Sequence, residues 1–558
     1  MAPARADFDA VVIGSGFGGA VTACKLAEEG WRVLVLERGR PYPPGSLPRT
    51  PRDIGNAFWD PEAARHGLVD LWTFSGMNVV LSAGLGGGSL IYANVMLRKP
   101  PETFVNVDGE RWPVSRVELD PHYDNVEAVQ RPERYPIDRA PYDKTRKTRA
   151  LLDAAHELGM EVENPPLAIV FASSPGEDPV PRAPIVEDVP SLHGLPRITC
   201  TLCGECDTGC NYGAKQTLDH TYLSRAVASG AEIRTLCDAR LLTEHESGWT
   251  VTYRQHVAGL DGVAKGLRDP VAEERRTVTA RHVVLGAGAI GSTSLLLRNR
   301  ASLPDLSPAL GHGVSANGDM MMFVRNARLP NGGGWRYLDP SVGPVITTSV
   351  RVPGSKLPSG REHYVQDGGA PAWTEWLWQM LEGPGDLWQE RGVAWRRLKE
   401  RLTGHRDSNF SDEVARGLGQ SGMSAAMMPM LGMGRDIPDA RLHLNHDGAL
   451  DMAFDPSASM VHYDALRKTG RELAEQMGAE WSEPPAQHTT SVHPVGGCAM
   501  SVNPLEGVVD PWGNVHGHPG LHVADGAVMP GPVGPNPSFT IAALADRFAE
   551  AMIEAGRP

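Results

Sequence analysis

The sequence predicts an α/β protein in which parallel strands end in glycine-rich turns. The apolar run Phe8–Ile13 suits a buried parallel strand, and a helical stretch then follows through Lys25 and ends near Gly30. A second apolar run covers residues 32–36. Strand, helix and strand of these lengths make a βαβ unit, so we expect a Rossmann-type nucleotide-binding domain.

The turn between the first strand and the helix has the spacing G-x-G-x-x-G over residues 14–19. Such a turn lets the backbone approach a pyrophosphate, which then lies at the positive end of the helix. An acidic residue at the end of the second strand can accept hydrogen bonds from a ribose diol. The candidate nucleotide-binding residues are Gly14, Gly16, Phe17, Gly18, Gly19 and Glu37. NAD and FAD both fit this motif, and a glycine turn without a ligand is the remaining alternative.

Two later turns favour FAD over NAD. A strand expected over residues 277–285 ends in a glycine turn that contains Gly288, and a short strand near residue 521 is followed by Asp525. Several backbone approaches of this kind suit a long, permanently bound dinucleotide. The nucleotide-binding pieces are thus separated along the chain. We expect a discontinuous FAD-binding domain over residues 1–99, 196–308 and 485–558, and a substrate-binding domain over residues 100–195 and 309–484.

Composition excludes some partners. The chain has 558 residues with 53 Lys and Arg against 67 Asp and Glu, a formal charge of −14, and no dense basic run, so nucleic acid is not an expected partner. No apolar stretch reaches the roughly 18 residues that a membrane span requires. The first strand begins so near residue 1 that we expect no signal peptide and a cytoplasmic protein.

Four of the seven cysteines have the spacing C-x2-C-x2-C-x3-C: Cys200, Cys203, Cys206 and Cys210. This is the spacing of bacterial ferredoxins, whose thiolates converge on a 4Fe-4S cluster, although Asn211 replaces the usual proline. A structural zinc site and packed free thiols are the alternatives. A cluster near the flavin would pass electrons singly to an external acceptor, whereas without one the reduced flavin could react with oxygen.

Three sequence blocks identify a resemblance: residues 14–19 with Glu37, residues 84–94 (GLGGGSLIYAN), and residues 493–536, which begin HPVGGCAM. With these blocks the chain resembles the glucose–methanol–choline (GMC) oxidoreductases, in particular their cholesterol-oxidase-like bacterial branch. The resemblance implies a bound FAD, whose ring faces His493 and Asn536. It also implies non-covalent attachment, because residues 84–89 contain no linking histidine. The further cofactor-binding residues expected are Gly86, Gly87, Gly88, Ser89, Asn94, Asp525 and Gly526.

The chemistry of these two residues suits oxidation of a CH–OH group. When a hydride leaves the carbon for flavin N5, the hydroxyl proton must leave too, and the imidazole of His493 can accept it. The Asn536 amide can hold the hydroxyl oxygen or the reduced flavin while charge develops. A structural histidine and a turn asparagine are the plain alternatives. The glutamate base that the family's sterol oxidases add cannot be assigned near residues 434–436.

The middle of the chain suggests the substrate. Tryptophans between residues 373 and 395 and methionines between 423 and 433 suggest a soft apolar chamber, with ordinary core packing as the alternative. We therefore expect an α+β substrate domain on an antiparallel sheet, and an FAD-dependent alcohol dehydrogenase or oxidase for a sterol- or terpenoid-like alcohol. A flavoenzyme with lyase or isomerase activity and a non-catalytic electron-transfer protein are the rivals.

Overall fold

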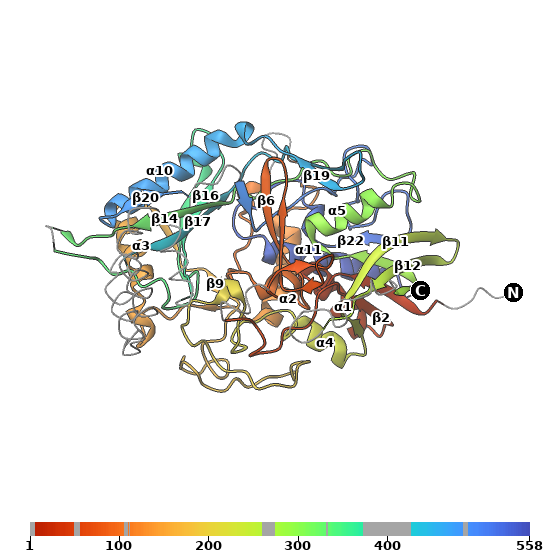
Figure 1. Ribbon diagram of the computed structural model, residues 1–558, viewed down its shortest axis with the longest axis horizontal. Helices are drawn as coiled ribbons and strands as arrows, with labels where there is room; N and C mark the ends of the chain where they lie inside the picture. The colour runs from red at the N-terminus through yellow and green to blue at the C-terminus, as the bar shows by residue number, and fades with distance from the viewer. Residues whose placement is uncertain are drawn as a thin grey trace, which may run out of the picture.

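The computed structural model describes residues 6–49, 56–104, 110, 112–258, 274–330, 333–371, 426–483 and 489–557. Figure 1 shows two sheets at opposite ends of the molecule, with both chain termini at the end that holds β2, β11 and β12. The predicted α/β fold with an antiparallel second sheet is confirmed. Within the described residues, no helix is both long enough and apolar enough to cross a membrane.

The first sheet has seven strands in the order β10-β2-β1-β13-β12-β11, with β22 also paired to β13. Strands β10, β2, β1, β13 and β22 are parallel, whereas β11, β12 and β13 form an antiparallel meander. The strands are β1 (Phe8–Ile13), β2 (Val33–Leu36), β10 (Glu232–Arg234), β11 (Cys237–His245), β12 (Gly248–Gln255), β13 (Glu274–Leu285) and β22 (Leu521–Val523). Sequence reasoning missed β12, although its buried Trp249, Val251 and Tyr253 alternate with less buried residues, as a strand requires.

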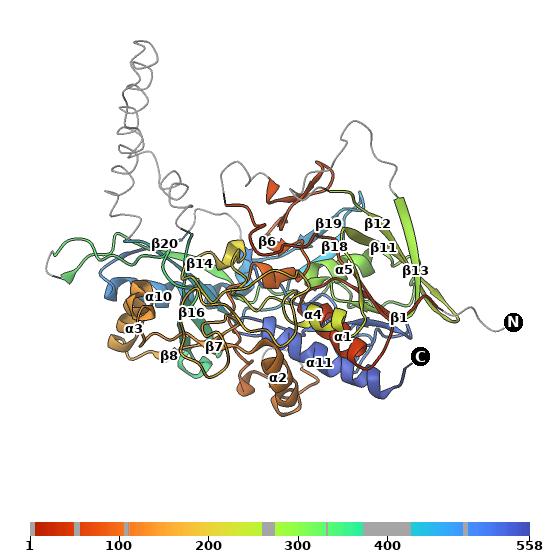
Figure 2. The ribbon, with the colours of Figure 1, turned by 90° about the horizontal axis from the view of Figure 1, so that it is seen from below.

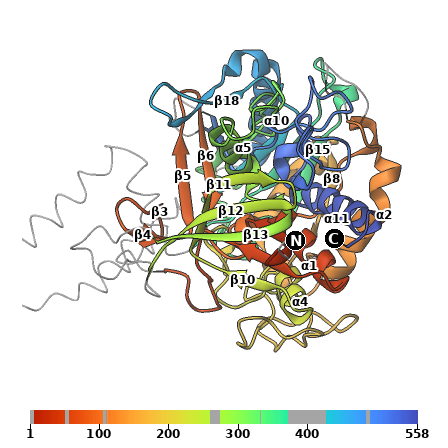
Figure 3. The ribbon, with the colours of Figure 1, turned by 90° about the vertical axis from the view of Figure 1, so that its right-hand side faces the viewer.

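Helices from distant parts of the chain cover this sheet. Helix α1 packs against α11 and α4, and α2 packs against α11. Figure 2 shows α1, α2 and α11 along one side of the molecule, with β6 and β18 on the opposite side, and Figure 3 shows α5 between β11 and β18. The helices are α1 (Phe17–Glu28), α2 (Arg116–Gln130), α4 (Tyr222–Ala228), α5 (Gly288–Arg298) and α11 (Ser538–Glu554). Helix α2 was not predicted, although Ser115 and Glu118 form a capping box at its start.

The second sheet has six antiparallel strands in the order β20-β14-β17-β16-β15-β8. Helix α10 packs on this sheet and on α3. The elements are β8 (Glu161–Glu163), β14 (Met320–Arg325), β15 (Ser349–Val352), β16 (His363–Asp367), β17 (Met428–Gly434), β20 (Glu480–Ser482), α3 (Arg146–Glu157) and α10 (Met460–Gln476). Met428 and Met430 are fully buried in the core beneath α10, so core packing accounts for them. The tryptophan segment and Met423 lie outside the described residues.

A small three-stranded sheet matters for the site. Strand β21 (Thr489–Ser491) pairs in parallel with β6 (Met77–Ser82), which pairs with β5 (Val69–Thr73). Because parallel strands end at the same edge, the turn after β6 and the loop after β21 emerge together. The remaining paired strands are β3 (Trp59–Asp60) with β4 (Arg65–His66), β7 (Glu133–Arg134) with β9 (Pro166–Leu167), and β18 (Arg441–Leu444) with β19 (Leu450–Ala453).

The two large sheets draw on different parts of the chain. All strands of the seven-stranded sheet fall within residues 1–99, 196–308 and 485–558, and all strands of the six-stranded sheet within residues 100–195 and 309–484. The domain boundaries themselves remain a prediction.

A buried ion pair fastens α3 to the second sheet, and it provides a stability test. The Lys147 ammonium binds the Asp367 carboxylate, and both side chains are fully buried. Replacing Asp367 by Ala leaves a buried ammonium without its partner, so we expect the free energy of unfolding to fall by about 3–5 kcal/mol. The midpoint of urea unfolding measures this change. A Lys147→Met/Asp367→Asn double variant, which keeps the Oδ1 acceptor of the Thr347 and Thr348 amides, should lose much less, and an equal loss would contradict the electrostatic explanation.

Candidate active site

Three glycine-rich turns meet at one edge of the seven-stranded sheet. The register pairs Ile13 at the end of β1 with Leu285 at the end of β13, and Leu285 in turn with Val523 at the end of β22. The turns that follow these strands therefore lie side by side. The carboxyl edge of a parallel sheet is where α/β proteins bind nucleotides.

Backbone contacts explain why this edge needs glycine. A Cβ on Gly18 would lie 1.9 Å from the Ala524 carbonyl oxygen, and a Cβ on Gly19 would lie 2.1 Å from that of Gly14. These two glycines permit close packing of α1 against the sheet. A Cβ on Gly16 would come no nearer than 3.7 Å to a neighbouring atom, so packing does not require glycine at that position. This freedom fits the predicted approach of a ligand to the backbone at Gly16.

Glu37 holds the first glycine turn in place. One carboxylate oxygen accepts hydrogen bonds from the Ser15 amide at 3.0 Å and the Ser15 hydroxyl at 2.6 Å, and the other accepts from the Gly39 amide at 2.8 Å. The Ser15 hydroxyl oxygen also accepts a hydrogen bond from the Gly86 amide at 3.0 Å. Sequence reasoning missed Ser15, although its place between two motif glycines was a signal. Glu37 thus binds protein groups, and its predicted contact with a ribose remains a prediction.

The second glycine turn contacts the first directly. A Cβ on Gly87 would lie 2.6 Å from the Gly16 Cα, and Gly86 has a φ of 111°. Residues Gly87–Leu90 form the short helix η2, in which the Ser89 hydroxyl donates to the Gly86 carbonyl and accepts from the Leu218 amide. Ser89 therefore stabilises the turn. Gly88 is exposed, and a Cβ added there would have no neighbouring atom within 4 Å.

Buried polar atoms beside this turn fit a bound FAD. Asn94 is fully buried in the left-handed conformation (φ 70°), and neither its amide nitrogen nor its oxygen has a hydrogen-bond partner. The Tyr92 hydroxyl and Asp219 Oδ1 are also buried without partners. Because unpaired buried polar groups are costly, a polar ligand such as FAD would suit this place. Asp219 was not predicted, and no motif in the sequence marks it.

Asp525 links the third turn to α5. Its carboxylate accepts hydrogen bonds from the Ala527 amide, the Gly288 amide and the Ser292 hydroxyl. Burial raises the pKa of Asp525 to about 6. Gly526 begins the short helix η10 (Gly526–Val528). The structure therefore gives Asp525 a part in holding the turns together, and its expected contact with the cofactor remains a prediction.

His493 lies immediately after β21 and is fixed by Asp319. Its ring Nδ1 is 2.8 Å from Asp319 Oδ1, and the His493 amide donates to Asp319 Oδ2 at 3.0 Å. Since a carboxylate only accepts hydrogen bonds, Nδ1 carries the proton and Nε2 is left as the basic ring nitrogen. The side chain is 17% exposed, so solvent or a small molecule reaches it.

Asn536 is buried and is held by an amide from the second sheet. Its Oδ1 accepts a hydrogen bond from Gln366 Nε2 at 3.0 Å, and Gln366 lies on β16. A neutral amide cannot act as a base. In the region where a catalytic glutamate was sought, Asp436 binds Ser315 and Ala316 instead, and burial raises its pKa to about 7. Gln366 was not predicted.

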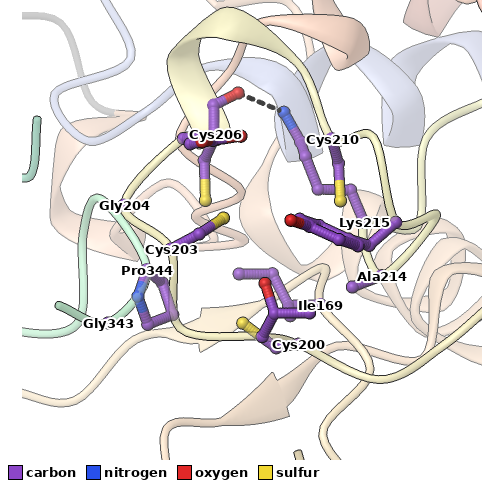
Figure 4. Close-up of a pocket in the computed structure, with 13 residues that line it drawn as sticks. Ile169, Cys200, Cys203, Gly204, Cys206, Cys210, Ala214, Lys215, Gly343 and Pro344 are labelled. Carbon is purple, nitrogen blue, oxygen red and sulfur yellow. Dashed lines mark hydrogen bonds between the residues drawn. The ribbon is translucent and has the colours of Figure 1, made fainter. Parts of the chain in front are cut away.

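The four clustered cysteines line one pocket (Figure 4). Ile169, Ala214, Lys215, Gly343 and Pro344 complete much of its wall. Cys200 and Cys206 are buried, while Cys203 and Cys210 are partly exposed. Burial raises the pKa of the Cys206 thiol to about 12 and also raises the pKa of the Cys200 thiol well above its usual value, so both are neutral thiols unless a metal replaces their protons.

The spacing of the sulfur atoms bears on the kind of metal. Among the described residues, the groups of three or more ligand atoms within 4.8 Å of one another include no set of these cysteines. Tetrahedral zinc with Zn–S bonds of about 2.3 Å would bring its sulfurs to about 3.8 Å from one another. The observed arrangement is therefore too open for a closed zinc site.

Lys215 connects the cysteine loop to the second glycine turn. Its buried ammonium donates to the Cys206 carbonyl at 3.0 Å and to the Leu90 and Tyr92 carbonyls at 3.1 and 2.8 Å. The short helices Gly87–Leu90 and Cys206–Thr208 also contact each other. The cysteine pocket is thus fastened to the segment expected to line the flavin.

Glycine turns that meet at the carboxyl edge of a parallel sheet are typical of a dinucleotide-binding protein. Family models described as GMC oxidoreductase match residues 197–313 and 427–545, and a model of an NAD(P)-binding Rossmann-like domain matches residues 12–46. These matches, with the relatives below, confirm that the chain resembles the GMC oxidoreductases and their cholesterol-oxidase-like branch. It is an FAD-dependent oxidoreductase that acts on CH–OH donors.

Known proteins resemble the chain over nearly its whole length. A cholesterol oxidase of Mycobacterium tuberculosis (strain H37Rv) is 28% identical over 561 residues, covering 98% of this chain and 91% of that protein. Paromamine 6'-oxidase of Streptomyces fradiae is 27% identical over 571 residues, covering 98% and 91%. The crystal structure of pyridoxine 4-oxidase from Mesorbium loti aligns with a TM-score of 0.55 at 16% identity, covering 98% and 99%, which shows a shared fold.

Substitutions at two neighbouring glycines distinguish an effect on backbone packing from an effect on cofactor binding. Gly87→Ala places a Cβ 2.6 Å from the Gly16 backbone, so we expect lower thermal stability of the apoprotein as well as loss of FAD. Gly88→Ala meets no atom within 4 Å, so the apoprotein should keep its melting temperature. If Gly88 lines the flavin, the added methyl group should nevertheless weaken FAD binding at least tenfold. Unchanged FAD affinity in Gly88→Ala, measured by flavin fluorescence, would remove Gly88 from the cofactor site.

Proposed function

We propose that this protein oxidises the CH–OH group of a hydrophobic, sterol- or terpenoid-like alcohol. His493 and Asn536 are the proposed catalytic residues, and FAD is bound without a covalent link. The observation that carries the proposal is the Asp319 contact, which leaves His493 Nε2 as a basic nitrogen on a partly exposed ring. When bound, FAD supplies the hydride acceptor at its N5 atom.

The chain's own residues handle the proton and the developing charge. His493 Nε2 accepts the hydroxyl proton as the hydride leaves the carbon, and its ring then carries a positive charge beside the Asp319 carboxylate. Asn536 Oδ1 is already bound by Gln366, so its Nδ2 group is the part of the amide available to donate to the substrate oxygen. With a glutamine beside Asn536, His493 is the proposed proton acceptor.

The names of similar proteins favour a hydrophobic substrate. The similar chains include cholesterol oxidases of Mycobacterium tuberculosis and Acinetobacter baumannii, whose names specify a sterol. The resemblance to paromamine 6'-oxidase shows that a polar alcohol is the alternative to test first.

We further propose that Cys200, Cys203, Cys206 and Cys210 hold a 4Fe-4S cluster. The ferredoxin spacing and the shared pocket support it. When bound, a cluster supplies single-electron transfer to an external acceptor, which would make the protein a dehydrogenase. Lys215 would keep this site next to the flavin-binding turn.

The second candidate is an oxygen-using oxidase without a cluster. It is favoured by the names of the relatives, several of which are oxidases. None of the seven cysteines forms a disulfide bond, which suits the reducing cytoplasm that we propose as the location.

Anaerobic flavin reduction tests the proposed reaction. We expect a sterol or long-chain alcohol to bleach the flavin absorption, and His493→Ala to slow this step by about 10²–10⁴-fold because it removes the proton acceptor. Stopped-flow absorbance measures the rate. His516→Ala is a matched control, since the side chain of this partly buried histidine of the same C-terminal segment is hydrogen-bonded to the Ser501 carbonyl and not to the residues proposed for chemistry. An equal rate in His493→Ala and the parent enzyme would contradict the proposed role.

Metal analysis tests the cluster. Protein purified without oxygen should contain about four iron and four acid-labile sulfide atoms per flavin. Cys206→Ser should lower the iron content and the broad visible absorption, whereas Cys237→Ser, which alters a buried cysteine of β11, should change neither. Protein that shows flavin absorption bands but contains no iron would contradict the cluster proposal and favour the oxidase.

A further inference from the structure

The segment Ser315–Asp319 lies between α5 and β14 and carries no motif, yet it contacts both loops of the proposed active site. All its residues are buried. Its start is fixed to Asp436, which binds the Ser315 hydroxyl and the Ala316 amide, and Ser315 exchanges backbone hydrogen bonds with Val495. We call residues 315–319 the clamp segment.

One end of the clamp segment holds the histidine loop. Asp319 Oδ2 accepts hydrogen bonds from the Val492 amide at 2.8 Å, the His493 amide at 3.0 Å and the Ser491 hydroxyl at 3.1 Å. Asp319 Oδ1 lies 2.8 Å from His493 Nδ1. A single carboxylate therefore fixes the backbone of the loop and the orientation of the ring.

The middle of the clamp segment holds the asparagine loop. Asn317 Oδ1 accepts from the Val533 amide at 2.8 Å and the Gly534 amide at 3.3 Å, and Asn317 Nδ2 donates to the Pro535 carbonyl at 3.1 Å. The three residues that precede Asn536 are thus bound by one side chain. Asn317 has a φ of 54°, a conformation that asparagine tolerates better than most residues.

We infer that Asp319 is a positioning residue for His493, and that Asn317 and Asp319 together set the geometry between His493 and Asn536. Two residues apart on one buried segment, they hold two loops that are 40 or more positions apart in the sequence. Asp319 presents His493 Nε2 to the substrate hydroxyl and stabilises the ring once it has taken the proton. This inference rests on the proposed function, because it assigns Asp319 to the same reaction.

A double-mutant cycle separates positioning from a purely structural role. In the FAD-loaded enzyme, Asp319→Asn should slow anaerobic flavin reduction by at least about 10²-fold, with little change in KM, because the ring loses its fixed orientation. In the His493→Ala background the same substitution should change the rate by less than about threefold, since Asp319 would act only through the ring. An equal loss in both backgrounds would overturn the inference.

Further variants keep the test decisive. If Asp319→Asn does not fold, Asp319→Glu, which retains the carboxylate, is carried through the same cycle. Asp546→Asn is the matched control, because this buried carboxyl of α11 binds His122, Asn125 and Lys25 and contacts neither the clamp segment nor His493 in the observed hydrogen bonds. It should leave the rate within about threefold. A rate as low as that of Asp319→Asn would show that loss of any buried carboxylate suffices, and would overturn the specific role of Asp319. If His493→Ala alone has no effect, the proposed function fails instead.

Amide hydrogen exchange of the apoprotein gives a readout that does not depend on turnover. Asp319→Asn should speed exchange at Val492 and His493 by at least tenfold and leave Val533 and Gly534 unchanged. Asn317→Ala should do the reverse, because each side chain accepts hydrogen bonds from one loop only. Equal loosening of both loops by both variants would contradict the division of roles between the two residues.

Discussion

Direct contact between backbone turns is the constraint on which the nucleotide end of this protein depends. Gly18 lies against Ala524, Gly14 against the turn after β13, and Gly87 against Gly16. A side chain at these positions would push apart segments that are far apart in the chain. Because the strands β1, β13 and β22 end in register, their turns reach one sheet edge, which is where α/β proteins bind nucleotides.

Away from that edge, buried polar side chains form the hydrogen bonds to backbone groups that helices and strands would otherwise form. Lys215 binds three carbonyls from two loops, Glu37 binds the first glycine turn, and Asp319 binds the histidine loop. Loops that enter a protein interior leave backbone groups without partners, and each such group must find one. In this protein the residues that satisfy them also fix the residues proposed for chemistry, so stability of the loops and geometry of the site are coupled.

Much of the fold could be predicted because local patterns were strong. The first βαβ unit and the strand over residues 277–285 both appear, and β13 begins only a few residues earlier than expected. Helices α2 and α3 were missed because both carry many charged residues, although α3 buries six of its twelve residues and so has an apolar face that the sequence contained.

The nucleotide motif and the cysteine spacing could be found in the sequence because each depends on residue types at short intervals, whereas the candidate pair His493 and Asn536 came from the resemblance to the GMC oxidoreductases. Only the tertiary structure shows which residues hold His493 and Asn536 in place. Asp319, Asn317 and Gln366 are an aspartate, an asparagine and a glutamine without any motif, and only folding places them beside His493, the loop before Asn536, and Asn536 itself. Hydrogen bonds depend on distances of about 3 Å between atoms, and a linear sequence does not specify such distances between residues far apart in the chain.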